Sequence, residues 1–209
     1  MAVLLLRLAA PLQAWGGSAK FEVRTTQREP TKSGVIGMLA AALGMPRDAD
    51  LSKFAALRFG IRVEREGRLL RDFHTAHSED GKAAYVTERY YLSDAVFLAA
   101  LESEDTAFLE TLAHALERPV YPLFLGRRSC PPTLPLLLGI REGTLMQVLR
   151  DEPKLEENTS VRIVCDAAGN GVPVQDMPIS FSPLHRQHGF RMVQEEIIFS
   201  DDHDPMAEL

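Results

Sequence analysis

Hydrophobic and polar positions alternate with more than one period along the chain, which is typical of a mixed α+β protein. A short Val/Leu-rich run at residues 3–8 predicts a buried strand. Residues 33–45 repeat apolar side chains at helical spacing after a Thr or Ser cap and stop at Gly44, so they predict a helix. Residues 105–118 show the same spacing behind the capping residue Asp105 and predict a second helix.

Strand-like patterns lie between and after these helices. Residues 54–74 alternate apolar side chains with arginines around a Glu-Gly turn and predict a hairpin. Residues 75–88 are polar and predict a mobile extension, whereas residues 90–101 predict a core strand. The order of elements favours a ferredoxin-like, RNA-recognition-motif-like βαββαβ sheet with helices on one face and an insertion near residues 70–90.

The last third of the chain carries weaker patterns. It predicts a short helix at residues 144–149, then an acidic linker, and strands at residues 161–165 and 189–199. Residues 200–209 are polar and are expected to be frayed. We therefore expect this part to be β-rich.

The composition suits one large domain, because 45% of the 209 residues are hydrophobic. No run of about 18 uncharged apolar residues occurs, and Arg7 interrupts the apolar start, so we expect a cytoplasmic protein with no membrane partner. The cysteines, Cys130 and Cys165, lack CxxC spacing, which argues against a disulfide framework and against a zinc site.

Charge is distributed unevenly along the chain. The net charge is −6, from 23 Lys and Arg against 29 Asp and Glu. Residues 1–75 nevertheless carry 12 basic against 7 acidic side chains, whereas residues 151–209 carry 4 against 12. This asymmetry favours a polyanionic partner at the N-terminal part, and charge scattered over a solvated surface is the alternative.

The N-terminal segment LRLAAPLQAWGGSAKFEVRTTQREPTKSG, residues 6–34, mixes arginines, hydroxyl groups, an amide and the single tryptophan. Aromatic rings and guanidinium planes stack on the bases of single-stranded RNA, while cations hold its phosphates. The segment therefore suits RNA. Trp15 is equally plausible as a core residue.

The opening of the first predicted helix is a second candidate phosphate site. Its unpaired N–H groups carry partial positive charge, Lys32 and Ser33 stand beside them, and no acidic residue lies in residues 30–45 to neutralise them. Alternatively, Gly34 and Gly37 simply allow close packing against the sheet. The Walker pattern GxxxxGK[ST] is absent.

The stretch GRRSCPP, residues 126–132, is a third candidate. The adjacent Arg127 and Arg128 are expected to point in different directions, so that one reaches a phosphate while the other pairs internally with an acid. The prolines that follow stiffen the segment and lower the entropy lost on binding. A purely structural ion-pair role for the arginines is the alternative.

Histidines raise the possibility of an enzyme. His74 and His77, with Tyr90 or Tyr91, could supply a general base and a donor for metal-independent RNA cleavage. The stretch HRQH, residues 185–188, could offer metal ligands, but it lacks a third ligand. We favour a non-catalytic reading, with no catalytic residue, no metal and no cofactor.

Five blocks of sequence resemble one family. They are LRLAAPLQAWG (6–16), RTTQREPTKSGVIGMLAAALG (24–44), RDFHT (71–75), RYYLSDAVFLAAL (89–101) and FLGRRSCPPTLPLLLG (124–139). In this order they resemble the CasD family, the RAMP-type subunit of the CRISPR type I-E Cascade antiviral surveillance complex.

The resemblance implies a RAMP palm over residues 1–140 with an inserted β-hairpin thumb at about 70–90, and a C-terminal extension, residues 141–209, packed on the palm. It implies a non-catalytic subunit that binds and caps the crRNA 5′ handle and contacts the backbone subunit CasC and the large subunit CasA. An endoribonuclease that processes precursor crRNA without a metal remains the alternative. The matched blocks supply these candidate RNA-binding residues: Gln13, Trp15, Arg24, Arg28, Lys32, Ser33, Arg71, His74, Arg127, Arg128 and Ser129.

Overall fold

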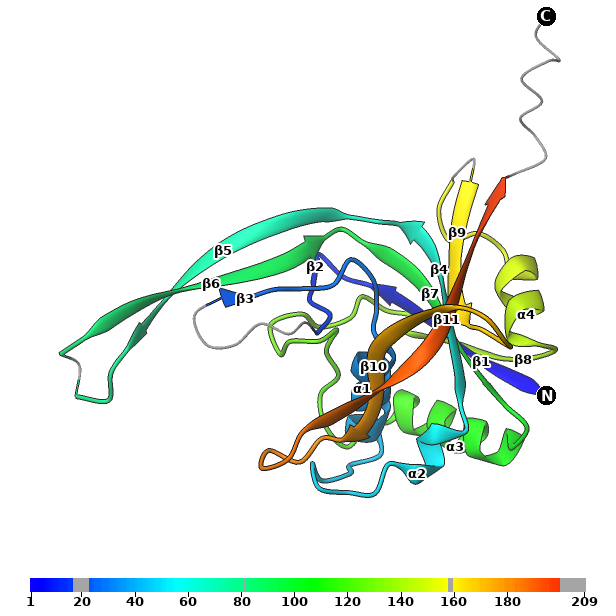
Figure 1. Ribbon diagram of the computed structural model, residues 1–209, viewed down its shortest axis with the longest axis horizontal. Coiled ribbons are helices and arrows are strands. Elements are labelled where there is room, and N and C mark those ends of the chain that lie inside the picture. Colours follow the sequence, from blue (N-terminus) through cyan, green and yellow to red (C-terminus); the bar gives the residue numbers. More distant parts are fainter. Residues whose placement is uncertain (17–22, 81, 158–159, 200–209) are drawn as a thin grey trace, which may run out of the picture.

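The computed structural model describes residues 1–16, 23–80, 82–157 and 160–199 (Figure 1). The helices are α1 (Lys32–Ala42), α2 (Ser52–Ala55), α3 (Thr106–Glu117) and α4 (Leu145–Asp151). In order across the larger sheet, the strands are β10 (Val172–Ser180), β11 (Gln187–Phe199), β9 (Ser160–Asp166), β4 (Arg58–Arg65), β7 (Val96–Ser103), β1 (Ala2–Ala9) and β8 (Leu137–Glu142). The strands of the smaller sheet are β2 (Leu12–Gln13), β3 (Val23–Arg24), β5 (Arg68–His77) and β6 (Ala84–Ser93). The tail that was expected to be frayed, residues 200–209, lies outside the described residues.

The larger sheet is antiparallel across its seven strands and is covered by helices on both faces. Successive side chains of β1 point to opposite faces. Leu4 and Leu6 share a core with α1 and α3, whereas Val3 and Leu5 pack with α4. This confirms a mixed α+β architecture of mostly antiparallel sheets with few helices.

Both long helices start where the sequence predicts. Thr31 Oγ1 accepts a hydrogen bond from Gly34 N at 3.1 Å at the start of α1. Asp105 Oδ1 accepts from Phe108 N at 2.9 Å at the start of α3. Gly44 follows α1 with a φ of +74°, and this left-handed conformation ends the helix.

The predicted hairpin over residues 54–74 is wrong. Strand β4 pairs with β7 and β9, whereas β5 pairs with β6. Gly67, between β4 and β5, has a φ of +74°, and a Cβ there would lie 2.6 Å from the carbonyl oxygen of Ser93. The glycine therefore carries the chain from one sheet to the other instead of folding it back on itself.

The predicted single strand over residues 90–101 is also wrong, because it is divided between β6 and β7. Asp94, with a φ of 59°, separates the two strands and moves the chain back into the larger sheet. Residues 75–88, which were expected to form a mobile extension, belong largely to β5, β6 and the turn between them. We call the β5–β6 pair, residues 68–93, the long hairpin. It projects from the body of the molecule (Figure 1).

The smaller sheet attaches the N-terminal segment to the long hairpin. Strands β2 and β3 pair with successive parts of β6, on the edge opposite β5. Strand β3 runs parallel to β6, with Arg24 opposite Arg89, whereas β2 is antiparallel to it. The segment after β1 is therefore held at the base of the long hairpin.

The C-terminal part adds three strands to the larger sheet. Strand β9 pairs with β4, and β11 and β10 follow outward. Strand β9 covers the predicted run at 161–165 and β11 covers that at 189–199. Strand β10 was not predicted. It contains Pro173 and Pro178, and proline usually argues against a strand, but both are tolerated here because β10 lies at the edge of the sheet. The division of the chain into a palm of residues 1–140 and a C-terminal extension of residues 141–209 stays a prediction.

Candidate nucleic-acid interface

The turn at residues 125–130 packs tightly on the N-terminal segment. Leu125 N donates to Cys130 O at 2.7 Å, and Ala14 N donates to Leu125 O at 3.1 Å. Gly126 has a φ of +85°, and a Cβ there would lie 1.5 Å from Ala14 O. Only glycine fits this contact.

Arg127 turns inward from this turn. Its Nη1 donates to Tyr90 O at 3.1 Å, and its Nη2 donates to Arg24 O at 2.9 Å and Thr25 O at 3.2 Å. Its guanidinium carbon lies 4.6 Å from the centre of the Tyr91 ring. One arginine of the pair is therefore held by internal contacts, but the expected acidic partner is wrong, because the acceptors of Arg127 are main-chain carbonyls.

Arg128 faces the solvent, so the two neighbours do point in different directions. Ser129, Arg24 and Arg28 are also exposed. Arg24 lies opposite Arg89 in the parallel pairing of β3 with β6, and the Nε of Arg89 is buried with no partner among the described atoms. The structure therefore gathers arginines from separate segments around the base of the long hairpin.

Gln13 and Trp15 are buried, with 0% and 1% of their surface exposed. Gln13 Nε2 donates to the carbonyl oxygens of Leu8 and Ala95 at 3.2 and 2.7 Å, and Trp15 Nε1 donates to Gln13 Oε1 at 3.1 Å. A Cβ at Gly34 would lie 2.9 Å from the Trp15 ring. The prediction that these side chains contact RNA is therefore corrected: both belong to the interior.

Lys32 is also buried, with 3% of its surface exposed. Its Nζ donates to Leu57 O at 2.6 Å and lies 3.0 Å from Asp166 Oδ2. Its main-chain N donates to Asp176 Oδ2 at 2.8 Å. The expectation of a vacant helix opening at Lys32 and Ser33 is wrong, because Asp176, which is 144 residues later in the chain, supplies the missing acid.

The same carboxylates bind a second cation. Arg191 Nε donates to Asp176 Oδ1 at 2.5 Å, and Arg191 Nη1 donates to Asp166 Oδ1 at 2.7 Å. We call Lys32, Asp166, Asp176 and Arg191 the ionic cluster. It ties β9, β10 and β11 to the start of α1.

Arg71 and His74 lie on the long hairpin with acidic partners. Arg71 Nε donates to Glu88 Oε2 at 3.0 Å, and the Arg71 guanidinium carbon lies 4.7 Å from the centre of the Phe73 ring. The hydrogen bond from Arg71 lowers the pKa of Glu88. His74 Nε2 lies 2.5 Å from Asp72 Oδ2, without the angles of a hydrogen bond. The charge of Arg71 is therefore balanced by Glu88 within the hairpin.

His74 is not brought together with either tyrosine considered for catalysis. His74 is opposite Thr87 and Tyr90 is opposite Arg71, so His74 and Tyr90 lie on opposite faces of the long hairpin. Tyr91 shares the face of His74, but only 2% of its surface is exposed and it lies under Arg127. In the described parts of the chain, no group of three or more His, Cys, Asp or Glu side chains is placed to hold a metal.

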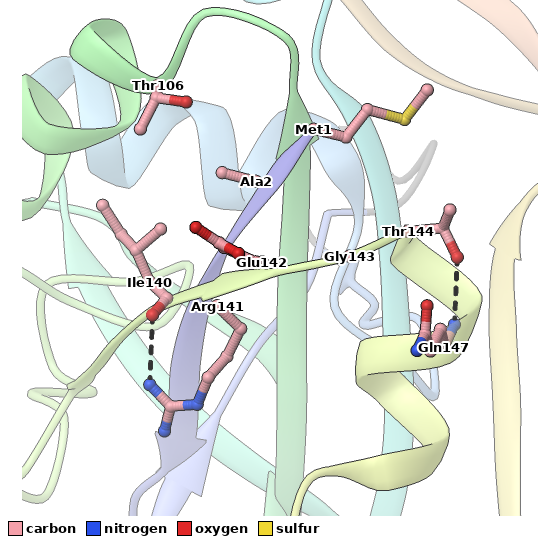
Figure 2. A pocket seen from close by; sticks show the side chains of 9 residues that line it. All are labelled: Met1, Ala2, Thr106, Ile140, Arg141, Glu142, Gly143, Thr144 and Gln147. Carbon is pink, nitrogen blue, oxygen red and sulfur yellow. Dashed lines mark hydrogen bonds between the residues drawn. The ribbon is translucent and has the colours of Figure 1, made fainter.

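A pocket of about 790 Å³ lies at the other end of β1 (Figure 2). It is lined by Met1, Ala2, Thr106, Ile140, Arg141, Glu142, Gly143, Thr144 and Gln147. None of the candidate residues lines this pocket. No helix among the described residues has the length and apolarity needed to cross a bilayer.

Arg89 was missed from the sequence. It lies between the predicted polar extension at residues 75–88 and the predicted core strand at residues 90–101, so it was not considered for binding. A cation next to two tyrosines was the available signal, since aromatic and basic side chains together suit RNA.

Comparisons with known proteins agree with one another. A model of the family described as CRISPR-associated protein (Cas_Cas5) matches residues 3–194. A protein of Escherichia coli (strain K12) described as CRISPR system Cascade subunit CasD is 41% identical over 157 residues, which cover 65% of this chain and 70% of that protein.

Two solved structures resemble the fold closely. A chain in a CRISPR RNA-guided surveillance complex has a TM-score of 0.81 at 32% identity, covering 94% of this chain and 90% of that chain. A chain described as a crystal structure of a Cas protein has a TM-score of 0.77 at 40% identity, covering 94% of this chain and 95% of that chain. Because the family model spans nearly the whole chain and these folds superpose, the chain belongs to the Cas5 family of CRISPR-associated proteins.

Proposed function

We propose that this chain is the subunit of a CRISPR Cascade surveillance complex that binds the 5′ handle of the crRNA and caps that end of the complex without catalysing a reaction. Two similarities support this role: the 41% sequence identity with the protein described as Cascade subunit CasD, and the similar fold of a chain in an RNA-guided surveillance complex.

The gathering of arginines at the base of the long hairpin is the observation that carries the proposal. Arg24 and Arg128 are exposed and Arg89 is half-buried, and they come from three segments that are joined there by Arg127. RNA binding needs a local positive surface, even in a chain whose net charge is −6.

The arrangement of strands supports a ferredoxin-like palm. The four strands β4-β7-β1-β8 are neighbours in this order, and α1 and α3 connect them in the sequence βαββαβ. The long hairpin takes the place of the thumb. Residues 1–140 would then form the palm with its thumb, and residues 141–209 an extension that packs on it.

The proposed direct RNA contacts are the exposed side chains of Arg24, Arg128 and Ser129 at the hairpin base, with Arg89 beside them, and the exposed Arg28, four residues after Arg24. Arg71 and His74 would contribute along the hairpin, although their acidic neighbours reduce their attraction for phosphate. The arginines would mainly supply position and affinity, while splayed bases on neighbouring side chains would supply sequence discrimination.

The partners that this role requires are the backbone subunit CasC and the large subunit CasA, in the cytoplasm. Residues 151–209 carry 4 basic against 12 acidic side chains, so this part is unsuited to RNA and would face protein or solvent. No cofactor is required, because binding alone accounts for the role.

Binding of a labelled handle RNA to Arg24→Ala, Arg128→Ala and the double variant tests the proposal. Each lost phosphate contact should weaken binding and reduce the slope of log K against log salt by about 0.7 for a single strand. Arg118→Ala, which removes an exposed arginine at the end of α3, is the matched control and should bind as the wild type.

A wild-type affinity and salt slope in the double variant would overturn the assignment of these contacts. The same preparation incubated with repeat RNA in EDTA should leave the RNA intact. Discrete cleavage that is abolished by His74→Ala would instead establish the endoribonuclease.

A further inference from the structure

We propose that Arg127 is a positioning residue, which acts on RNA through Arg24 by fixing the segment after β2 against the long hairpin. The inference rests on the proposed RNA-binding function and assigns the two adjacent arginines different tasks. Arg128 would meet phosphate directly, whereas Arg127 would set the geometry of the surface.

The contacts of Arg127 join two separate parts of the chain. One side of its guanidinium binds the Tyr90 carbonyl of the long hairpin, and Nη2 binds the carbonyls of Arg24 and Thr25 in the N-terminal segment. The Tyr91 ring lies on one face of the guanidinium, 4.6 Å from its carbon. The planar fork of arginine can serve these acceptors together, which the single ammonium of lysine cannot do in the same geometry.

Among the described residues, the segment that Arg127 holds has short attachments to the rest of the fold. Strand β3 contributes only Val23 and Arg24 to the ladder with β6. Beyond it, Trp15 N donates to Thr26 Oγ1 at 2.8 Å and Gln27 N donates to Trp15 O at 2.8 Å. Without Arg127, the carbonyls of residues 24 and 25 would lose the hydrogen bonds from its guanidinium at the place where the side chain of Arg24 has to be oriented.

These carbonyls also matter electrostatically. Carbonyl oxygens carry partial negative charge, so an exposed pair of them beside a phosphate path would repel the RNA. The guanidinium of Arg127 offsets their charge and leaves the side chain of Arg24 as the group presented to solvent.

Arg127 reaches this place because the main chain on both sides of it is fixed. Gly126 packs against Ala14 with no room for a Cβ, and Cys130 N donates to Arg127 O at 2.8 Å. Arg128, one residue on, is exposed at the same turn. At this turn, the guanidinium of Arg127 therefore points inward, whereas the side chain of Arg128 is exposed.

A double-mutant cycle on handle-RNA affinity tests this coupling. Arg24→Ala and Arg127→Ala should each weaken binding about tenfold, and their combination should weaken it little further, because both remove the same contact. Arg128→Ala should also weaken binding about tenfold. Its combination with Arg127→Ala should weaken binding about a hundredfold, because the two side chains act through different contacts.

Arg127→Lys separates positioning from charge. It keeps the positive charge but not the fork, so it should bind as weakly as Arg127→Ala. Full rescue by lysine, or multiplied effects of Arg24→Ala and Arg127→Ala, would overturn the inference. If Arg127→Ala fails to fold, the same cycle is measured with Arg127→Lys. Failure of the proposed function is distinguishable, since the wild type would then not bind or Arg128→Ala would be silent.

Discussion

Arg127 and Arg128 are neighbours in sequence that face different surroundings. The first is bound to three main-chain carbonyls and the second is exposed. At the scale of single residues, the site therefore depends on side chains that organise it as much as on those that face the solvent.

Gly126→Ala should damage this site through the backbone. The new Cβ would lie 1.5 Å from Ala14 O, and the residue would keep an unfavourable φ of +85°. We expect the free energy of unfolding to fall by roughly 2 kcal/mol, measured by urea denaturation, with weaker RNA binding.

Gly169→Ala is the matched control for that experiment. A Cβ at Gly169 would meet nothing within 4 Å, so stability and binding should stay close to the wild type. Equal stability of the two variants would show that the turn is not packed as described.

The two cysteines should be unreactive in the folded protein. Burial raises the pKa of both thiols, and each has 1% of its surface exposed. A thiol reagent at mildly alkaline pH should label neither Cys130 nor Cys165 until denaturant is added.

The same shift has a consequence for stability. A thiol whose pKa is higher in the folded protein than in the unfolded chain contributes stability that is fully present below the unfolded-state pKa. This contribution is lost as the pH rises through the folded-state pKa. Stability should therefore decline at alkaline pH, above the ordinary thiol pKa. Rapid labelling of either cysteine under native conditions would contradict their burial.

At the scale of elements, those with strong local signals were predicted and those defined by distant contacts were not. The strand at residues 3–8 and the helices behind Thr31 and Asp105 follow from periodicity and capping. The partner of β4 could not be read from its own sequence, because pairing depends on residues far along the chain.

The candidate site was predicted in part for the same reason. The inward and outward split of the arginine pair follows from their adjacency, but the carbonyls that Arg127 binds belong to residues 24, 25 and 90. Likewise, the acid at the start of α1 comes from β10. Sequence spacing carries no signal for such contacts.

Lys32→Met tests the structural reading of the α1 opening. Removal of the ammonium takes one cation from the ionic cluster and a donor from Leu57 O, and it leaves Arg191 as the cluster's one cation for both Asp166 and Asp176. We expect the free energy of unfolding to fall by about 2 kcal/mol, somewhat less than for a buried charge left without any partner.

Lys53→Met, at an exposed lysine of α2, is its control and should be neutral. Handle-RNA affinity per folded molecule should not change in Lys32→Met. Weaker binding at unchanged stability would restore Lys32 as a phosphate contact.

At the scale of the whole molecule, the fold places basic and acidic parts of the chain in different regions. The basic N-terminal third supplies β2, β3 and β5 at the base of the long hairpin, and the middle third adds Arg89, Arg127 and Arg128 there. The acidic C-terminal third supplies β9, β10 and β11 at one edge of the larger sheet. The ionic cluster ties the two parts together without exposing its own cations. A chain with a net charge of −6 can therefore present a local cationic surface.

Photo-crosslinking of the guide RNA within the assembled complex tests this account most directly. A photoreactive base in the 5′ handle should crosslink to peptides of this chain that contain residues 23–28 or 127–129, identified by mass spectrometry. Crosslinks confined to the acidic strands β9, β10 and β11, or their absence from this chain, would contradict the claim that RNA lies at the base of the long hairpin.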